Sequence, residues 1–216
     1  MSSAVSIRSL GRLHERFVLG RRVHALAQVL AELMPPNASV LDVGCGSGAV
    51  ANLIMRVRPD VRIQGVEVLV RPGCQIPCQQ YDGNRLPFAD GSFEVCMCVD
   101  VLHHTDDVAA SLHELARVSR RFLLIKDHLC ENRFDFLVLK LMDWVGNRPQ
   151  GVVLPYRYQS REVWKEQFRE CGLEELFFAT KIPLYPVPIG WIAARRLHFA
   201  VLLEKVATPA RLSAKA

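Results

Sequence analysis

A glycine-rich segment between a strand pattern and a helix pattern restricts the fold of this chain more than any other feature. Residues 40–48 read VLDVGCGSG; they follow Pro35 and Pro36 and directly precede a helical pattern over residues 49–57. Glycines at a turn from a strand into a helix permit positive φ and let the backbone approach a ligand closely. The segment therefore predicts a strand, a ligand-binding turn and a helix, as found in open α/β sheets.

Short apolar runs alternate with helical patterns along the rest of the chain. Strands are expected over residues 39–43, 61–68, 75–81, 93–99, 122–125, 174–180 and 196–204. Helices are expected over residues 23–34, 49–57, 106–119, 132–144 and 160–171. No clear helix pattern separates the last two strands. The predicted fold class is therefore α/β: a doubly wound, mostly parallel seven-stranded sheet with a C-terminal antiparallel hairpin.

Polar residues and a glycine mark the ends of two of these helices. Thr105 is the expected N-cap of the helix over residues 106–119, with Asp106 and Asp107 in its first turn, where the helix dipole favours them. Ser160 is expected to cap the helix over residues 160–171, and Gly172 to close it.

Composition limits the class of protein. The chain has 216 residues, 50% of them hydrophobic, and 23% charged with a net charge of +5. This balance excludes a largely disordered protein, and a dispersed charge of this size does not by itself indicate a nucleic-acid partner. No apolar run reaches the roughly 18 residues of a spanning helix. The arginine-containing N-terminus lacks the compact apolar region of a secretory signal, so a cytoplasmic location is expected.

The seven cysteines do not form a recognisable metal-binding pattern. Cys74 and Cys78 form a C-x3-C pair, and Cys96 and Cys98 a C-x-C pair within an apolar run. Neither has a second Cys or His pair at zinc-site spacing. The sequence therefore predicts reduced cysteines and no metal site.

Two acidic residues indicate which ligand the glycine-rich turn binds. Read with Ala49, the turn also satisfies the dinucleotide pattern G-x-G-x-x-G/A. However, Asp42 would repel a pyrophosphate, whereas it suits a ligand that carries an ammonium group or a cationic sulfur. Glu67 ends the next predicted strand, 23 residues after Gly44, where a carboxylate can accept hydrogen bonds from ribose hydroxyls. Asp42 therefore disfavours a nicotinamide dinucleotide.

A third acidic residue follows the next predicted strand. Asp82 opens the segment DGNRLPFADGSF, residues 82–93. It would lie at the carboxyl edge of the sheet, where open α/β sheets bind ligands, and could accept a hydrogen bond from an adenine amino group.

These motifs, in order, resemble one known family. The order DVGCGSG, an acid ending the second strand, DGxxLPFADGSF and VDVLHH is similar to that of class I S-adenosylmethionine-dependent methyltransferases. Within that class the chain resembles the small-molecule methyltransferases related to the menaquinone and ubiquinone biosynthesis enzymes. The resemblance covers roughly residues 38–127. It implies a single domain with a helical cap (1–36), a cofactor-binding half (38–128), an acceptor-side half (129–206) and a tail (207–216).

The resemblance implies S-adenosylmethionine as the cofactor and assigns the residues that bind it. Those residues are Asp42, Gly44, Cys45, Gly46, Gly48, Glu67, Val68, Asp82, Gly83, Asp100 and Val101. The residues of the glycine-rich turn would line the methionine part, Glu67 would hold the ribose, and Asp82 would meet the adenine amino group. Asp100, Val101 and His104 would flank the donor methyl group.

Methyl transfer needs a base only if the acceptor must lose a proton. His104, Asp127 and His128 are the predicted catalytic residues, because they follow the fourth and fifth strands and histidine titrates near neutral pH. His103 is also a candidate, with the alternative that one ring of the His103–His104 pair only packs in a turn. The alternative for Asp127 is a structural ion pair involving Lys126.

The segment after the fifth strand is expected to bind a small-molecule acceptor. It contains Trp144, Asn147, Tyr156 and Tyr158, and aromatic walls with an amide suit a hydrophobic or aromatic molecule. The alternative is that these aromatic residues close the core. Residues 182–194, with three prolines, would form either a second pocket wall or, as the less favoured alternative, a shallow membrane contact.

Two other functions stay open at this point. One is a nucleic-acid (RNA) methyltransferase, although residues 100–103 read DVLH where base-modifying enzymes carry an N/D-P-P-Y/F tetrad, and no nucleic-acid partner is expected. The other is a regulator that binds S-adenosylmethionine without turnover. The sequence does not indicate the acceptor atom or the oligomeric state.

Overall fold

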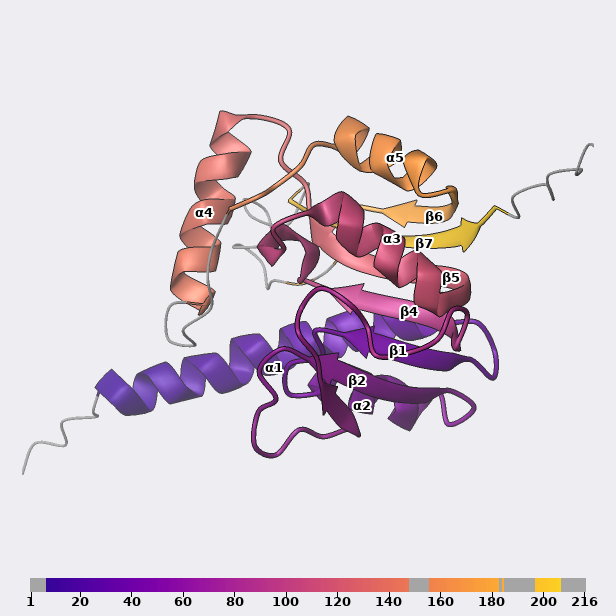
Figure 1. Cartoon of the computed structure of the whole chain (residues 1–216). Helices are drawn as coiled ribbons and strands as arrows, with labels where there is room; N and C mark the ends of the chain where they lie inside the picture. The colour runs from indigo at the N-terminus through magenta and orange to yellow at the C-terminus, as the bar shows by residue number, and fades with distance from the viewer. Residues whose placement is uncertain (1–6, 148–155, 183, 185–196, 207–216) are drawn as a thin grey trace, which may run out of the picture.

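Seven strands form one sheet in the order β3-β2-β1-β4-β5-β7-β6 (Figure 1). The computed structural model describes residues 7–147, 156–182, 184 and 197–206. The strands are β1 (Ser39–Val43), β2 (Arg62–Glu67), β3 (Cys78–Gln80), β4 (Phe93–Val99), β5 (Ser119–His128), β6 (Leu173–Ala179) and β7 (His198–Lys205). The first five are parallel, and β7 pairs antiparallel with both β5 and β6. The predicted sheet and its C-terminal antiparallel strands are confirmed.

Helices cover both faces of this sheet. They are α1 (Ile7–Leu33), α2 (Ala49–Val57), α3 (Val108–Val118), α4 (Arg133–Asn147) and α5 (Arg161–Glu170), with a short 3-10 helix η1 (Leu102–His104) after β4. In Figure 1, α1 and α2 lie behind the sheet and α3 and α5 in front of it. Helix α4 stands apart from both layers, beside the carboxyl ends of the parallel strands (Figure 1).

Alternate residues of β4 pack into the two cores, as expected for a sheet buried on both faces. Val95 and Met97 lie in the cluster with the α1 and α2 residues Leu30 and Ile54. Cys96 and Cys98 lie in the opposite cluster, which includes α3 and the α5 residues Trp164 and Phe168. The continuous apolar run of β4 follows from this burial on both sides.

Strand β5 is longer than predicted at both ends. The sequence pattern indicated only residues 122–125, because charged residues flank the apolar run. Lys126 and Asp127 nevertheless continue the strand, since they pair with Ala200 and Phe199 of β7, and both are fully buried. Pairing with a strand far away in the sequence explains why polar side chains stay inside the sheet.

The predicted cap of α3 is wrong by two residues. Asp107 is the N-cap: its Oδ1 accepts a hydrogen bond from the Ala110 amide at 2.9 Å, and the helix begins at Val108. The Thr105 hydroxyl instead donates to the Leu102 carbonyl in η1, at 2.8 Å. Asp and Thr both cap helices, and the η1 turn, which the sequence pattern did not reveal, uses Thr105.

The other predicted caps and breaks are confirmed. The Ser160 hydroxyl caps α5, and Gly172 follows it with a φ of +66°. Helix α1 ends just before the two prolines, and Arg58 donates hydrogen bonds to the Ala31 and Met34 carbonyls at that end.

Some expectations concern residues that the structure does not describe. Of the segment 182–194, only Ile182 and Leu184 are described, and both are buried. Within the described ranges, no helix is both long and apolar enough to cross a bilayer.

Candidate active site

The carboxyl ends of β1, β2, β4 and β5 place the predicted site residues along one edge of the sheet. The glycine-rich turn follows β1, Glu67 ends β2, Asp100 follows β4, and Asp127 lies at the end of β5. This is the edge at which open α/β sheets bind ligands.

The glycine-rich turn requires its glycines for two different reasons. Gly44, Gly46 and Gly48 all have positive φ, at 72°, 56° and 70°. A Cβ at Gly44 would overlap the Val101 side chain, so the turn and the loop after β4 approach closely there. A Cβ at Gly46 would meet nothing within 4 Å, so the turn is open at that point.

Glu67 ties the turn to the end of β2. Its Oε2 accepts a hydrogen bond from the Gly46 amide at 2.8 Å, and its Oε1 accepts one from the Val68 amide at 2.9 Å. A carboxylate has about four acceptor positions, so both oxygens can accept further hydrogen bonds from a ribose.

Asp42 lies beneath the turn as a buried carboxyl. It is 4% exposed and pairs in the sheet with Gly65 of β2 and Met97 of β4. Burial, together with repulsion from Glu67, raises the pKa of Asp42 to about 7. A cationic group bound next to Asp42 would remove this penalty and favour the ionised carboxylate.

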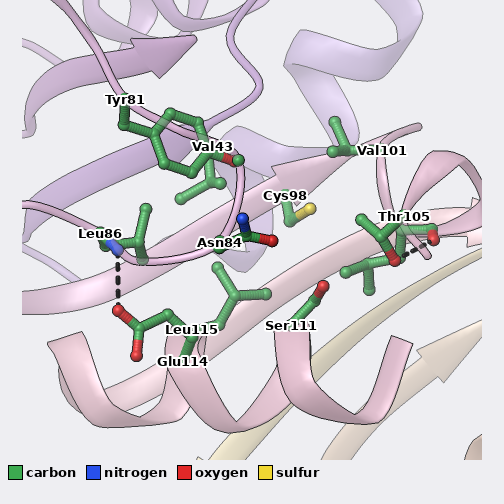
Figure 2. A pocket seen from close by; sticks show the side chains of 12 residues that line it. Val43, Tyr81, Asn84, Leu86, Cys98, Val101, Thr105, Ser111, Glu114 and Leu115 are labelled. Carbon is green, nitrogen blue, oxygen red and sulfur yellow. Dashed lines mark hydrogen bonds between the residues drawn. The ribbon is translucent and has the colours of Figure 1, made fainter. Parts of the chain in front are cut away.

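A pocket lies between the ends of β1 and β4 and the loop after β3 (Figure 2). It encloses about 340 Å³, part of which is open to solvent. Its lining includes Val43, Tyr81, Gly83, Val101 and Leu102. Apolar walls with exposed backbone suit a flat heterocycle such as adenine.

The loop after β3 is held by its own side chains and by α3. Asp82 Oδ1 accepts hydrogen bonds from the Asn84 and Arg85 amides, both at 2.8 Å, and these bonds lower the pKa of Asp82. Glu114 accepts a hydrogen bond from the Leu86 amide at 2.7 Å and forms an ion pair with Arg117. Glu114 and Arg117 therefore shape this side of the pocket.

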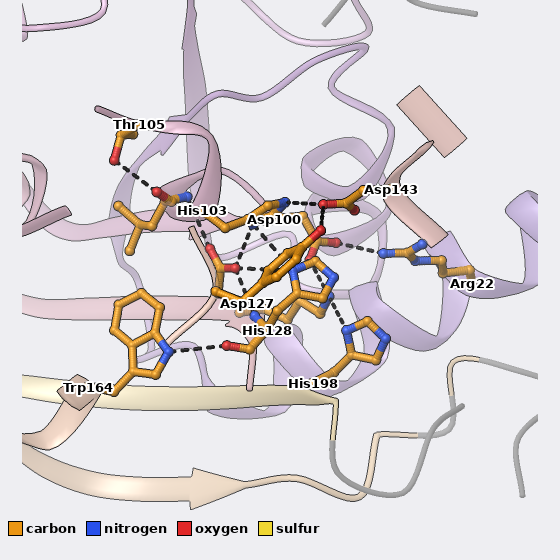
Figure 3. A network of polar contacts seen from close by, with 12 residues as sticks. Arg22, Asp100, His103, Thr105, Asp127, His128, Asp143, Trp164 and His198 are labelled. Carbon is orange, nitrogen blue, oxygen red and sulfur yellow. Dashed lines mark hydrogen bonds and ion pairs between the residues drawn. The ribbon is translucent and has the colours of Figure 1, made fainter. Parts of the chain in front are cut away.

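Asp100 faces away from the pocket, toward α1 and β5. It has a positive φ of 57° and pairs with Arg22 of α1 at 2.8 Å and with the buried ammonium of Lys126 (Figure 3). Although burial opposes ionisation, Lys126 and Arg22 hold the pKa of Asp100 well below its usual range. The structure thus gives Asp100 an ion-pairing role, whereas its predicted contact with the cofactor stays a prediction.

Asp127 is hydrogen-bonded to His103, a residue for which the sequence left open a role in packing alone. The two side chains are 0% and 2% exposed, and His103 Nδ1 donates to Asp127 Oδ1 at 2.6 Å. Asp127 also accepts hydrogen bonds from the Leu102 and His128 amides. Burial lowers the pKa of His103, but the attraction and hydrogen bond of Asp127 outweigh it and raise the pKa above its usual value.

His128 and His104 flank this pair. His128 Nδ1 lies 3.2 Å from Asp127 Oδ1, and the His128 and His103 rings are edge to face with their centroids 4.4 Å apart. Burial and the neighbouring His103 lower the pKa of His104 to about 4, and its Nδ1 is buried without a hydrogen-bond partner. His104 is therefore neutral at pH 7.

Helix α4 and the segment before α5 close this side of the site. Asp143 Oδ2 of α4 lies 3.7 Å from His103 Nε2, and the Tyr158 hydroxyl donates to the same carboxylate (Figure 3). The Tyr158 ring stacks 5.9 Å from His103. No local sequence pattern pointed to Asp143, because its role depends on a contact with residues 40 positions away.

The other predicted acceptor residues lie farther out or are not described. Trp144 lies on α4 and is 47% exposed. Tyr156, with a φ of 54°, is partly buried, and the Lys140 ammonium lies 5.2 Å from its ring centre. Asn147 ends α4, and its side chain lies outside the described residues. Their acceptor role stays a prediction.

Three side chains near Lys126 have the composition of a metal site. Asp100, His128 and His198 lie close enough together to share an ion. However, the Lys126 ammonium pairs with Asp100 and lies 3.2 Å from His198 Nδ1. The Lys126 ammonium therefore already provides a positive charge at this cluster.

A family profile described as "Methyltransferase domain" matches residues 41–121. This match runs from within β1 to the start of β5, and it includes the turn, Glu67 and the histidine pair. Residues 41–121 are thus similar to the methyltransferase domain family. The pocket and the acidic residues at its edge lie within the matched region.

Named relatives match part of the chain. An O-methyltransferase of Pyrenophora dematioidea is 34% identical over an alignment of 108 residues that covers 43% of this chain and 40% of the relative. The 2-methyl-6-phytyl-1,4-hydroquinone methyltransferase of Synechocystis is 32% identical over an alignment of 107 residues that covers 44% of this chain and 33% of the relative. The chain thus covers two fifths or less of these relatives' length.

The whole fold has solved counterparts. A SAM-dependent methyltransferase from Aquifex aeolicus superposes with a TM-score of 0.60 over 92% of this chain and 98% of that protein, at 16% identity. At this identity the likeness shows the shared fold.

Proposed function

We propose that the protein transfers a methyl group from S-adenosylmethionine to a small phenol- or hydroquinone-like acceptor. The observation that carries this proposal is the pairing of a cofactor-type turn with a buried His103–Asp127 pair at the same sheet edge. The first implies a cofactor, and the second implies that the acceptor loses a proton.

The residues present fit S-adenosylmethionine in three respects. The turn is open at Gly46, where the methionine part would lie. Asp42 offers a buried carboxylate to a cationic group, and Glu67 retains acceptor positions for the ribose. The apolar pocket beside Asp82 suits the adenine ring.

Bound S-adenosylmethionine supplies a methyl group on a cationic sulfur, and the departing thioether needs no protonation. The protein therefore has to position the acceptor and exclude water, which can be worth effective molarities on the order of 10⁵ M or more. His103 would take the acceptor proton at Nε2, the ring nitrogen that faces α4, while Asp127 fixes the ring through Nδ1. Asp127 is thus a positioning residue.

The acceptor class rests on this base and on the relatives. When a phenol or hydroquinone loses its hydroxyl proton, the oxygen becomes a good nucleophile, and so do the ring carbons that the oxygen activates. The Synechocystis relative is named for a hydroquinone, and the Pyrenophora relative is an O-methyltransferase. The tyrosine rings beside the histidines suit an aromatic acceptor.

Cofactor binding can be tested by calorimetry with S-adenosylmethionine, S-adenosylhomocysteine and NAD. We expect both adenosyl compounds to bind, and Asp42→Asn to weaken binding at pH 8 by at least about tenfold, about 1.4 kcal/mol. The matched control is Glu32→Gln, which removes an exposed carboxylate from α1. Binding of NAD alone would contradict the proposal.

Turnover can be tested with labelled S-adenosylmethionine and a panel of phenols, hydroquinones and metabolite extracts. His103→Gln should lower kcat by about 100-fold or more without weakening S-adenosylhomocysteine binding. The control is His113→Gln, an exposed histidine on α3. A protein that binds the cofactor but labels nothing would instead be the regulator, and labelling of RNA would indicate the nucleic-acid alternative.

A further inference from the structure

Three cysteine thiols meet on the side of the glycine-rich turn that faces β2 and β3. Cys45 lies in the turn itself, Cys74 in the loop between β2 and β3, and Cys78 at the start of β3. Their sulfur atoms all lie within 4.8 Å of one another, and Cys45 Sγ is 3.4 Å from Cys78 Sγ. All three residues are partly buried.

Two glycines make room for this thiol cluster. A Cβ at Gly65, which pairs with Cys78 in the sheet, would overlap the Cys45 sulfur. A Cβ at Gly48 would lie 3.2 Å from Cys74 Sγ. A side chain at either position would push a thiol out of the group.

The spacing of the sulfur atoms matches that of metal ligands. Thiolates bind Zn²⁺ at about 2.3 Å, so two of them at tetrahedral corners lie about 3.8 Å apart. The observed separations, from 3.4 Å to no more than 4.8 Å, need only small side-chain adjustments to reach this value. A disulfide between Cys45 and Cys78 would use two thiols and leave Cys74 without a role.

We propose that Cys45, Cys74 and Cys78 form a binding site for a thiophilic divalent cation such as Zn²⁺, with a fourth position open to solvent. The local sequence contains only the C-x3-C pair, and the third ligand comes from 33 residues before Cys78. The bound ion would fasten the turn that carries Gly44 and Gly46 to β3.

The neighbouring charges agree with a cation at this place. The carboxylates of Asp42 and Glu67 act electrostatically on Cys45 and Cys78, respectively. These negative charges favour a bound cation, and metal binding would release thiol protons.

The test titrates Cd²⁺, as a spectroscopic substitute for Zn²⁺, into the reduced, chelator-treated full chain under argon. We expect one equivalent to bind with a thiolate-to-metal charge-transfer band in the near ultraviolet, and Zn²⁺ to displace it. Loss of a residue that only supports a metal ligand costs about 10- to 100-fold in affinity, so Cys45→Ser, Cys74→Ser and Cys78→Ser should each cost at least about tenfold.

Cys171→Ser is the matched control, because Cys171 is also partly buried but follows α5 on the opposite face of the sheet. It should bind Cd²⁺ as the unmodified protein does. If Cys45→Ser fails to fold, Cys74→Ser decides, since Cys74 lies in a loop. Absence of the band, unchanged affinity in Cys74→Ser, or a Cys45–Cys78 disulfide with no metal binding after reduction would each overturn the proposal.

Discussion

The buried carboxyl of Asp42 makes the stability of the folded protein depend on pH. In the unfolded chain its carboxyl ionises near 3.8, but in the folded protein burial and Glu67 raise its pKa to about 7. The folded state therefore binds one more proton between these values, and its stability falls as the pH rises through them. Under the proposed function, a cationic group bound next to Asp42 would offset this cost.

Replacing Asp42 with Asn should remove that pH dependence. Between pH 5 and pH 8 the free energy of unfolding of wild type falls by the equivalent of about two pKa units, because Asp42 ionises more readily in the unfolded chain. Asp42→Asn lacks this loss, so it should gain about 3 kcal/mol relative to wild type across this range. Urea unfolding at both pH values measures it. Glu32→Gln, at an exposed site, should show no relative gain. If the stability curves of Asp42→Asn and wild type stay parallel, Asp42 is ionised in the folded protein.

The sequence indicated Asp42 as a cofactor-binding residue and favoured His104 over His103 as a catalytic residue, whereas in the structure it is His103 that pairs with Asp127. Both histidines lie in η1, and neighbouring residues of a tight turn face different directions. The conformation of η1 determines which of the two rings contacts Asp127, and η1 follows Asp100, which has a positive φ. No spacing rule predicts such a backbone conformation in an aspartate.

At the scale of elements, the close approach of two loops makes Gly44 sensitive to substitution. Gly44→Ala should cost about 2–4 kcal/mol of stability, because it combines positive-φ strain with overlap of Val101. Gly73→Ala is the control: its φ is +77°, but a Cβ there meets nothing within 4 Å, so about 1 kcal/mol is expected.

Urea unfolding of both variants separates the two causes. Adding Val101→Ala to Gly44→Ala should restore part of the stability, because it removes the overlapping methyl groups. Equal losses for the two glycine variants would mean that the loops do not touch at this point.

The corrected cap of α3 gives a second prediction at this scale. Asp107→Ala should destabilise the protein by about 1 kcal/mol, because the Ala110 amide loses its acceptor. Asp106→Ala should change stability by less than about 0.5 kcal/mol, since that side chain is fully exposed. Chemical unfolding measures both, and a larger loss for Asp106→Ala than for Asp107→Ala would contradict Asp107 as the N-cap.

Element positions were predictable where local pattern decides them. β1 and α2 have the predicted bounds, because apolar periodicity, prolines and glycines all act there. The bounds of β5 were not predictable, since its polar end is stabilised by β7, more than 70 residues later. Pairing of that kind leaves no mark in a local window.

At the scale of the whole molecule, the site joins segments from most of the chain. Arg22 of α1 reaches Asp100, and Asp143 of α4 reaches His103. The sequence predicted that residues after β5 would build the acceptor side, and it named Tyr158. It could not show that Tyr158 contacts a carboxylate that faces the histidines, because that contact depends on how α4 packs.

This packing should set the pH dependence of His103. Asp127, Asp100 and Asp143 all raise the pKa of His103, so Asp143→Asn should lower it, because it removes a negative charge 3.7 Å from His103 Nε2. The acid limb of kcat/KM would then move to lower pH, because His103 loses its proton earlier. Histidine signals in a proton NMR titration report the same shift without an acceptor.

Asp135→Asn is the control on the same helix. Asp135 lies near the start of α4, where its Oδ2 accepts a hydrogen bond from the Glu131 amide, so it should leave the histidine titration unchanged. His128 and His104 also face His103, and either ring would act in the opposite sense when it is protonated. A midpoint that stays fixed or rises in Asp143→Asn would therefore mean that those rings, and not the carboxylate of α4, control the proton on His103.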